Sequence, residues 1–205
     1  RPYRLKRALF PGKDQRDWRL IMAAAFTIAG TFNIFAFLLG LLMYMKTENE
    51  LNVGGLASIQ AIAAIVTSII VARTMTPRSR LKYMRWGVAM LLVAGTLMFT
   101  ELTLITLLIF GLLRSTAGPL FGIAHFSLRM DAIANCAEEP HQRIEYIGAW
   151  EVPLALGRVV MMLLLIGLAD RFTEGELGIR IALFLLCSLR VFTYALLSKT
   201  SVARG

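Results

Sequence analysis

One apolar segment that contains two opposite charges constrains this chain more than any other feature. Residues 144–170 read IEYIGAWEVPLALGRVVMMLLLIGLAD, where Glu151 and Arg158 interrupt a mostly apolar run. A helix needs roughly 20 apolar residues to cross a bilayer core, and this run is long enough. A charge at the centre of such a helix costs on the order of 2.5–3.5 kcal/mol, so it usually faces a bundle interior or a wet cavity. Glu151 and Arg158 are about two helical turns apart and therefore share a helix face.

Five further apolar runs bring the number of predicted transmembrane helices to six. Hydrophobic residues make up 57% of the 205 residues and charged residues only 17%, whereas ordinary globular domains are about 25% charged. We therefore expect an all-α membrane protein with a bundle of six helices over residues 20–198. A basic cytoplasmic arm at residues 1–19 and a cytoplasmic tail at residues 199–205 flank it. The six spans are residues 20–45, 53–72, 86–99, 102–126, 144–170 and 179–197.

The distribution of Lys and Arg among the loops predicts the orientation of the bundle. The N-terminal arm and the loop at residues 73–85 are strongly basic, while the loops after the first, third and fifth runs are not. The positive-inside rule then places both termini in the cytoplasm, in what we expect to be a bacterial plasma (inner) membrane. Trp18, Trp86, Trp150 and Tyr194 fall near the cytoplasmic helix ends, as expected for a headgroup belt.

Composition argues against several functional classes. The net charge of +9 follows membrane topology, so no nucleic-acid partner is expected. Cys136 and Cys187 form neither a disulfide framework nor a metal-ligand spacing. His125 and His141 lie at a helix end and in a loop, and no paired carboxylates appear at membrane depth, so neither a serine protease nor a metalloenzyme is indicated. We therefore expect no enzyme, cofactor or metal.

Polar residues inside the predicted spans are the candidate functional groups. Arg114 is compatible with a gating role or a structural ion pair, and Glu151 with Arg158 with an inter-helix lock or substrate contact. Near a helix end, Arg190 is expected to snorkel toward the interface. Three explanations account for the excess of Arg over Glu: carboxylates supplied by a partner, an anionic or amphiphilic ligand, or Arg side chains that snorkel. The remaining polar candidates, for an inter-helix hydrogen bond or ligand contact, are Asn33 and Gln60.

The fourth predicted span also carries a seam of small residues that would let a neighbouring backbone approach closely. Pro119 within that span, and Pro153 two residues after Glu151, are expected to kink their helices. The seam consists of Gly111, Ser115, Gly118 and Gly122.

With six spans and both ends inside, the chain resembles one half of a major facilitator superfamily transporter. The loop Arg73-Thr-Met-Thr-Pro-Arg-Ser-Arg-Leu-Lys82 resembles a degenerate form of that family's loop motif. The motif's Gly and Asp are absent, which favours the C-terminal half, and the basic arm then resembles the linker between the halves.

The resemblance implies roles for the polar residues. The first and fourth helices would line the central cavity, making Asn33 and Arg114 substrate-cavity candidates. The second and fifth would flank the seam with the other half, making Gln60, Glu151 and Arg158 gating or coupling candidates. The sixth would lie outside, in agreement with snorkelling by Arg190.

The predicted function is therefore that of a membrane secondary transporter half, which moves a small solute by alternating access, with proton coupling as one way of driving it. Its partners would be the lipid bilayer, a small-molecule substrate and a second six-helix half, joined covalently or as a homodimer. The alternative is a six-helix substrate-binding subunit of an energy-coupled importer, with Ala25 and Ala29 placed for docking to a partner helix.

Overall fold

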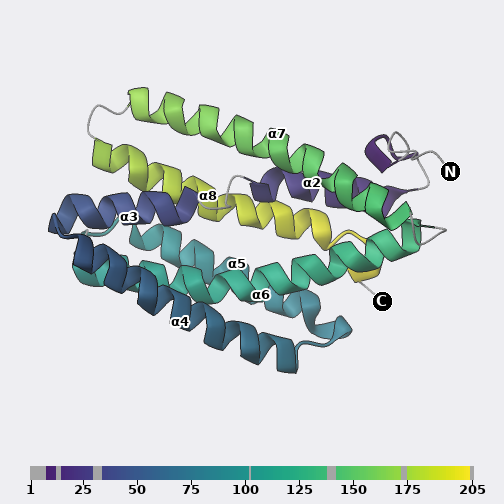
Figure 1. Cartoon of the computed structure of the whole chain (residues 1–205), viewed down its shortest axis with the longest axis horizontal. Coiled ribbons are helices and arrows are strands. Elements are labelled where there is room, and N and C mark those ends of the chain that lie inside the picture. Colours follow the sequence, from purple (N-terminus) through teal and green to yellow (C-terminus); the bar gives the residue numbers. More distant parts are fainter. Residues whose placement is uncertain are drawn as a thin grey trace.

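The computed structural model describes residues 8–12, 15–29, 34–101, 103–137, 142–171 and 175–203, and these residues are almost entirely helical, without strands. The helices run roughly along one long axis (Figure 1). In chain order they are α2 (Arg16–Ala29), α3 (Ile34–Thr47), α4 (Glu50–Thr74), the 3-10 helix η1 (Pro77–Ser79), α5 (Arg80–Leu97), α6 (Leu104–Cys136), α7 (Gln142–Arg171), α8 (Gly175–Leu197) and the 3-10 helix η2 (Ser201–Ala203).

Side-chain caps set the starts of two long helices. Asn49 precedes α4, and its side chain accepts a hydrogen bond from the backbone N–H of Leu51 at 2.9 Å. Thr103 precedes α6 and accepts one from the N–H of Thr106 at 3.2 Å. These caps satisfy N–H groups that have no partner within the helix.

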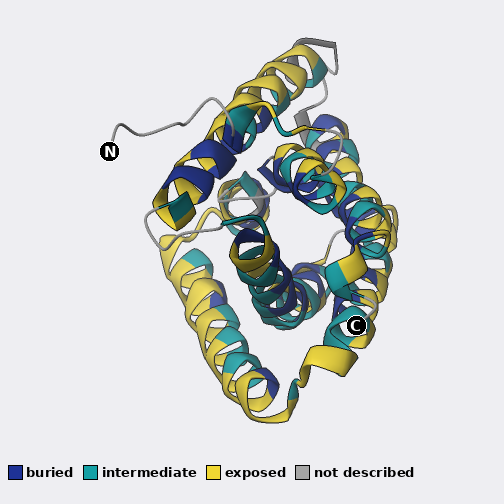
Figure 2. Cartoon of the chain, turned by 90° about the vertical axis from the view of Figure 1, so that its right-hand side faces the viewer, coloured by how far each residue is buried: buried dark blue, intermediate teal, exposed yellow. Residues whose placement is uncertain are grey.

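Four helices of the described residues are long and apolar enough to cross a membrane: Glu50–Thr74, Leu104–Cys136, Gln142–Leu168 and Leu177–Leu197. Large apolar side chains are exposed along the outer helices, including Ile62 and Ile65 of α4 and Leu163 and Ile166 of α7. Buried residues gather where the helices face one another (Figure 2). An apolar surface of this extent is unusual for a soluble monomer and is suited to lipid or a protein partner.

The expected first span, residues 20–45, consists of two helices rather than one. The helix α2 ends at Ala29 and α3 begins at Ile34, each with 14 residues, so neither alone reaches the roughly 20 residues needed to span a bilayer. The chain continues after Ala29 with Gly30 and the β-branched Thr31, both weak helix formers. The third expected span is α5, whose first turns carry Arg80, Lys82 and Arg85.

The interval between the fourth and fifth expected spans, residues 127–143, is largely helical in its described part, because α6 continues to Cys136 and α7 begins at Gln142. The 33 residues of α6 correspond to roughly 50 Å at 1.5 Å per residue, well beyond a hydrocarbon core of about 30 Å. Residues 127–136 include good helix formers such as Leu128, Arg129 and Met130, so the helix continues past membrane depth.

Two apolar clusters follow one another along the bundle. One joins α2, α5, α6 and α7 around Trp18, Phe121 and Trp150. The other joins α3, α5, α6 and α8 around Leu42, Phe110 and Leu183. The two halves of the broken first span therefore belong to different parts of the core.

The contacts between helices show an approximate internal repeat. In this repeat α2 and α3 together, the first expected span, correspond to α6, while α4 corresponds to α7 and α5 to α8. The helix α4 packs along α6 as α7 packs along α2, and α5 packs along α6 as α8 packs along α2. The helices α5 and α8, which correspond to each other, pack together. The repeat has an exception among the described helices: α7 packs against α8, but the corresponding pair α4 and α5 has no equally extensive contact.

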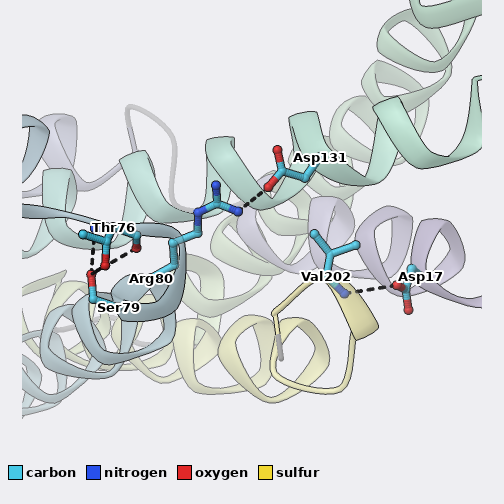
Figure 3. A network of polar contacts seen from close by, with 6 residues as sticks. All are labelled: Asp17, Thr76, Ser79, Arg80, Asp131 and Val202. Atoms are coloured by element: carbon cyan, nitrogen blue, oxygen red, sulfur yellow. Dashed lines mark hydrogen bonds and ion pairs between the residues drawn. The ribbon is translucent and has the colours of Figure 1, made fainter. Parts of the chain in front are cut away.

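One end of the bundle is tied by polar contacts between distant segments, and it is here called the basic end. Arg80, at the start of α5, pairs with Asp131 near the end of α6, and Asp17 in α2 binds the backbone of η2 (Figure 3). The helix α2 therefore begins at the end of the bundle where α8 finishes (Figure 1). The described basic residues at the basic end of the bundle are Arg16, Arg19, Arg73, Arg78, Arg80, Lys82, Arg85, Arg143 and Lys199.

Candidate functional site

A half-open cavity of about 400 Å³ lies among five helices, and predicted site residues form part of its wall. Most of its wall is apolar, and its charged members are Arg114 and Arg190. The lining residues are Ala36 of α3, Ala57, Gln60, Ala61 and Ala64 of α4, Leu91 of α5, Arg114, Ser115, Ala117, Gly118, Pro119 and Phe121 of α6, and Arg190 of α8.

Two of the predicted residues meet at this cavity. Arg114 of α6 donates from Nη1 to Oε1 of Gln60 on α4 over 3.4 Å, a long hydrogen bond. The close approach depends on Gly111, because a Cβ there would lie 2.7 Å from Nε2 of Gln60. The structure thus brings together a residue expected in the cavity and one expected at the seam.

The small-residue seam of α6 is used only in part. At Gly111 and the buried Ser115 the helix packs closely, while no heavy atom lies within 4 Å of a Cβ built at Gly118 or Gly122. Gly118 instead borders the cavity together with Pro119. The absent side chain at Gly118 therefore contributes open space and not helix contact.

Arg190 faces the bundle interior, so the expectation that it snorkels from an outer helix is wrong. Its guanidinium carbon lies 4.8 Å from the centre of the Phe121 ring, in cation–π distance. Its Nε is buried and has no hydrogen-bond partner among the described residues. Arg190 occupies the same face of α8 as the buried residues Leu183, Leu186, Thr193 and Leu197, which turns it inward.

A second polar cluster extends from the cavity toward the basic end. His125 is buried between Phe121 and Trp150, with both ring centres 6.3 Å away, and the guanidinium of Arg129 lies 4.1 Å from the Trp150 ring centre. The Nε2 of His125 and the Nε of Arg129 are buried without hydrogen-bond partners in the described part of the chain. Spacings of 11 and 4 residues place Arg114, His125 and Arg129 on one face of α6, a signal that the sequence already contained.

Glu151 and Arg158 lie apart from the cavity, on the exposed surface of α7. An electrostatic neighbour of Glu151 in the described structure is Arg129 of α6. Asn33, the remaining cavity candidate, lies outside the described residues. The described residues contain no group of three or more His, Cys, Asp or Glu that would hold a metal ion.

Comparison with known proteins gives one distant relationship of note. The chain is 27% identical over 170 residues to the uncharacterized protein YqgE of Bacillus subtilis (strain 168). The alignment covers 83% of this chain and 39% of YqgE, so the chain spans about two fifths of that protein's length. No family model and no solved structure matches the chain.

Proposed function

We propose that this chain forms one six-helix half of a membrane secondary transporter of the major facilitator type. It would rock against a second six-helix bundle and expose a small-molecule site to each side of the membrane in turn. The observation that carries the proposal is the packing that persists when the first three spans are exchanged for the last three. Inverted repeats of three helices within each six-helix half are typical of this transporter class.

The charge distribution supports an orientation for the bundle. The basic end gathers most of the described Arg and Lys residues outside the spans, whereas the opposite end carries Glu48, Glu50 and Glu101 beside Lys46 and Arg180. In the proposed orientation the basic end faces the cytoplasm of a bacterial cell.

The surface of α7 supports a protein partner. Glu151 and Arg158 are exposed on a helix that is otherwise apolar enough to cross a membrane. Charges at membrane depth are costly against lipid and normally face protein or a water-filled cavity. A second bundle seated on this face would cover both. The aligned part of YqgE is less than half of that protein, so the relative has length for a second unit of this size.

Alternating access makes a direct prediction for Ala61, an exposed residue of the cavity wall. In the full-length protein, with Cys136→Ser and Cys187→Ala as background, Ala61→Cys should react with an impermeant maleimide from either side of sealed vesicles of defined orientation. Arg78→Cys and Glu101→Cys, at opposite ends of the bundle, serve as one-sided controls. Labelling of Ala61→Cys from a single side would contradict the proposal and favour the substrate-capture subunit.

A further inference from the structure

We infer that the cavity between α4, α6 and α8 binds a small organic acid, with its carboxylate between Arg114 and Arg190 and its apolar body against the alanines of α3 and α4. This assignment deepens the proposed function and rests on it for the role of the site in transport. It rests on the cavity alone for the chemistry of the ligand.

The positive charge of the cavity wall indicates that the ligand is an anion. Its lining contains two guanidinium groups and no acidic residue. Two cations that share an apolar wall repel each other and lose hydration, and both effects are relieved by an anion placed between them. Arginine suits a carboxylate because its planar donors match the two carboxylate oxygens.

The hydrogen-bond donors of the two arginines indicate that the anion carries acceptor oxygens. The Nε of Arg190 is buried and lacks a hydrogen-bond partner among the described residues, although its guanidinium lies against the Phe121 ring. A buried donor without an acceptor is costly, and such atoms are rare in folded proteins. Gln60 lies beside Arg114 and helps to orient it. A carboxylate in the cavity would pair with the guanidinium of Arg190, which lines it.

Size and polarity define the remainder of the ligand. The volume of about 400 Å³ falls within the range of small-molecule sites, about 300–1,000 Å³. Ala36, Ala57, Ala61 and Ala64 form an apolar wall facing the arginines. Inorganic phosphate or acetate would leave that wall uncovered, whereas an acid with an aromatic or short aliphatic body would fill it.

Equilibrium dialysis of the full-length protein in detergent tests this inference with benzoate, and benzylamine is the cationic probe of matched shape. Benzoate should bind and benzylamine should not. Arg114→Gln and Arg190→Gln should each lower benzoate affinity at least tenfold, and Arg190→Lys should recover part of the loss. Arg180→Gln, on α8 but outside the cavity lining, should leave affinity unchanged.

A second measurement keeps both arginines, in case the Gln variants do not fold. Benzoate should slow maleimide labelling of Ala61→Cys, and benzylamine should not. Absence of benzoate binding, equal binding of benzylamine, or displacement of benzoate by equimolar inorganic phosphate would each overturn the assignment. Because no vesicle or transport is involved, a negative result here leaves the two-sided labelling test of alternating access intact.

Discussion

The carboxylate of Asp17 holds the backbone of Ser201, although 184 positions separate the two residues. Both carboxylate oxygens accept from the Ser201 backbone N–H at 3.0 Å, and the Ser201 hydroxyl also donates to the carboxylate. The N–H of Val202 donates to it at 3.4 Å (Figure 3). The first described long helix is thereby fastened to the segment that follows the last one.

Replacing Asp17 with Ala should loosen η2 without unfolding the bundle. The contact is exposed to solvent, so we expect a loss of only about 1 kcal/mol. Hydrogen exchange at the amides of Ser201 and Val202 should become roughly fivefold faster, while exchange in α4 should not change. Asp17→Asn, which keeps an acceptor oxygen, should have a smaller effect. Equal exchange in the wild type and Asp17→Ala would show that this contact does not hold η2.

Gly157→Ala should separate α2 from α7. A Cβ at position 157 would collide with the carbonyl oxygen of Phe26 and lie 2.7 Å from the Cβ of Ala29. Because backbone cannot move aside cheaply, the expected cost is on the order of 1–3 kcal/mol. Gly167→Ala on the same helix meets nothing within 4 Å and should be neutral or stabilising by up to about 1 kcal/mol. Thermal unfolding in detergent compares the two, and equal midpoints would refute a close α2–α7 contact.

Glu48→Gly should stabilise the turn between α3 and α4. Glu48 is the described non-glycine residue with positive φ, at 48°, a left-handed conformation that costs an L-residue roughly 1–2 kcal/mol. Glycine at this position after a helix should recover about 1 kcal/mol. The matched variant Glu50→Gly removes the same charge within the first turn of α4 and should destabilise. A lower unfolding midpoint for Glu48→Gly would contradict the expectation.

Gly111→Ala should move Gln60 away from Arg114. The nearest atom to the new methyl group would be the amide end of a flexible side chain, which can rotate aside, so the cost in stability should be smaller than for Gly157→Ala. Losing one hydrogen bond worth about 1 kcal/mol should weaken carboxylate binding in the cavity by roughly fivefold. Gly55→Ala on α4 has open space around it and serves as the control. Unchanged affinity in Gly111→Ala would exclude Gln60 from the site.

The sequence was informative about which segments are helical and which polar residues lie inside them, because hydropathy reports both directly. It placed Arg114 and Gln60 inside spans, and the structure brings them together. It was wrong about Arg190, since distance along a helix gives depth but not rotation about the axis. Lipid is as apolar as the helix interfaces, so the periodicity that turns Arg190 inward has little contrast in a membrane helix.

The division of the first span was also beyond prediction from hydropathy. Residues 20–45 contain no charged residue and no proline. Glycine is common in membrane helices, so Gly30 does not by itself predict that a helix ends at Ala29. The two pieces follow from tertiary packing, which places α2 against α7 and α3 against α4. Six spans and a cytoplasmic location for both ends stay predictions.

That division has a mechanical consequence. The helix α2 (Arg16–Ala29) packs mainly against α7 and α8, whereas α3 (Ile34–Thr47) packs against α4, α6 and α8. A shift of α4 would act directly on α3, which packs against it, and not on α2, which has no comparable contact with α4. Both pieces also contact α6 and α8. The two helices of the first expected span would then move separately, each against the helices α6 and α8 that both contact.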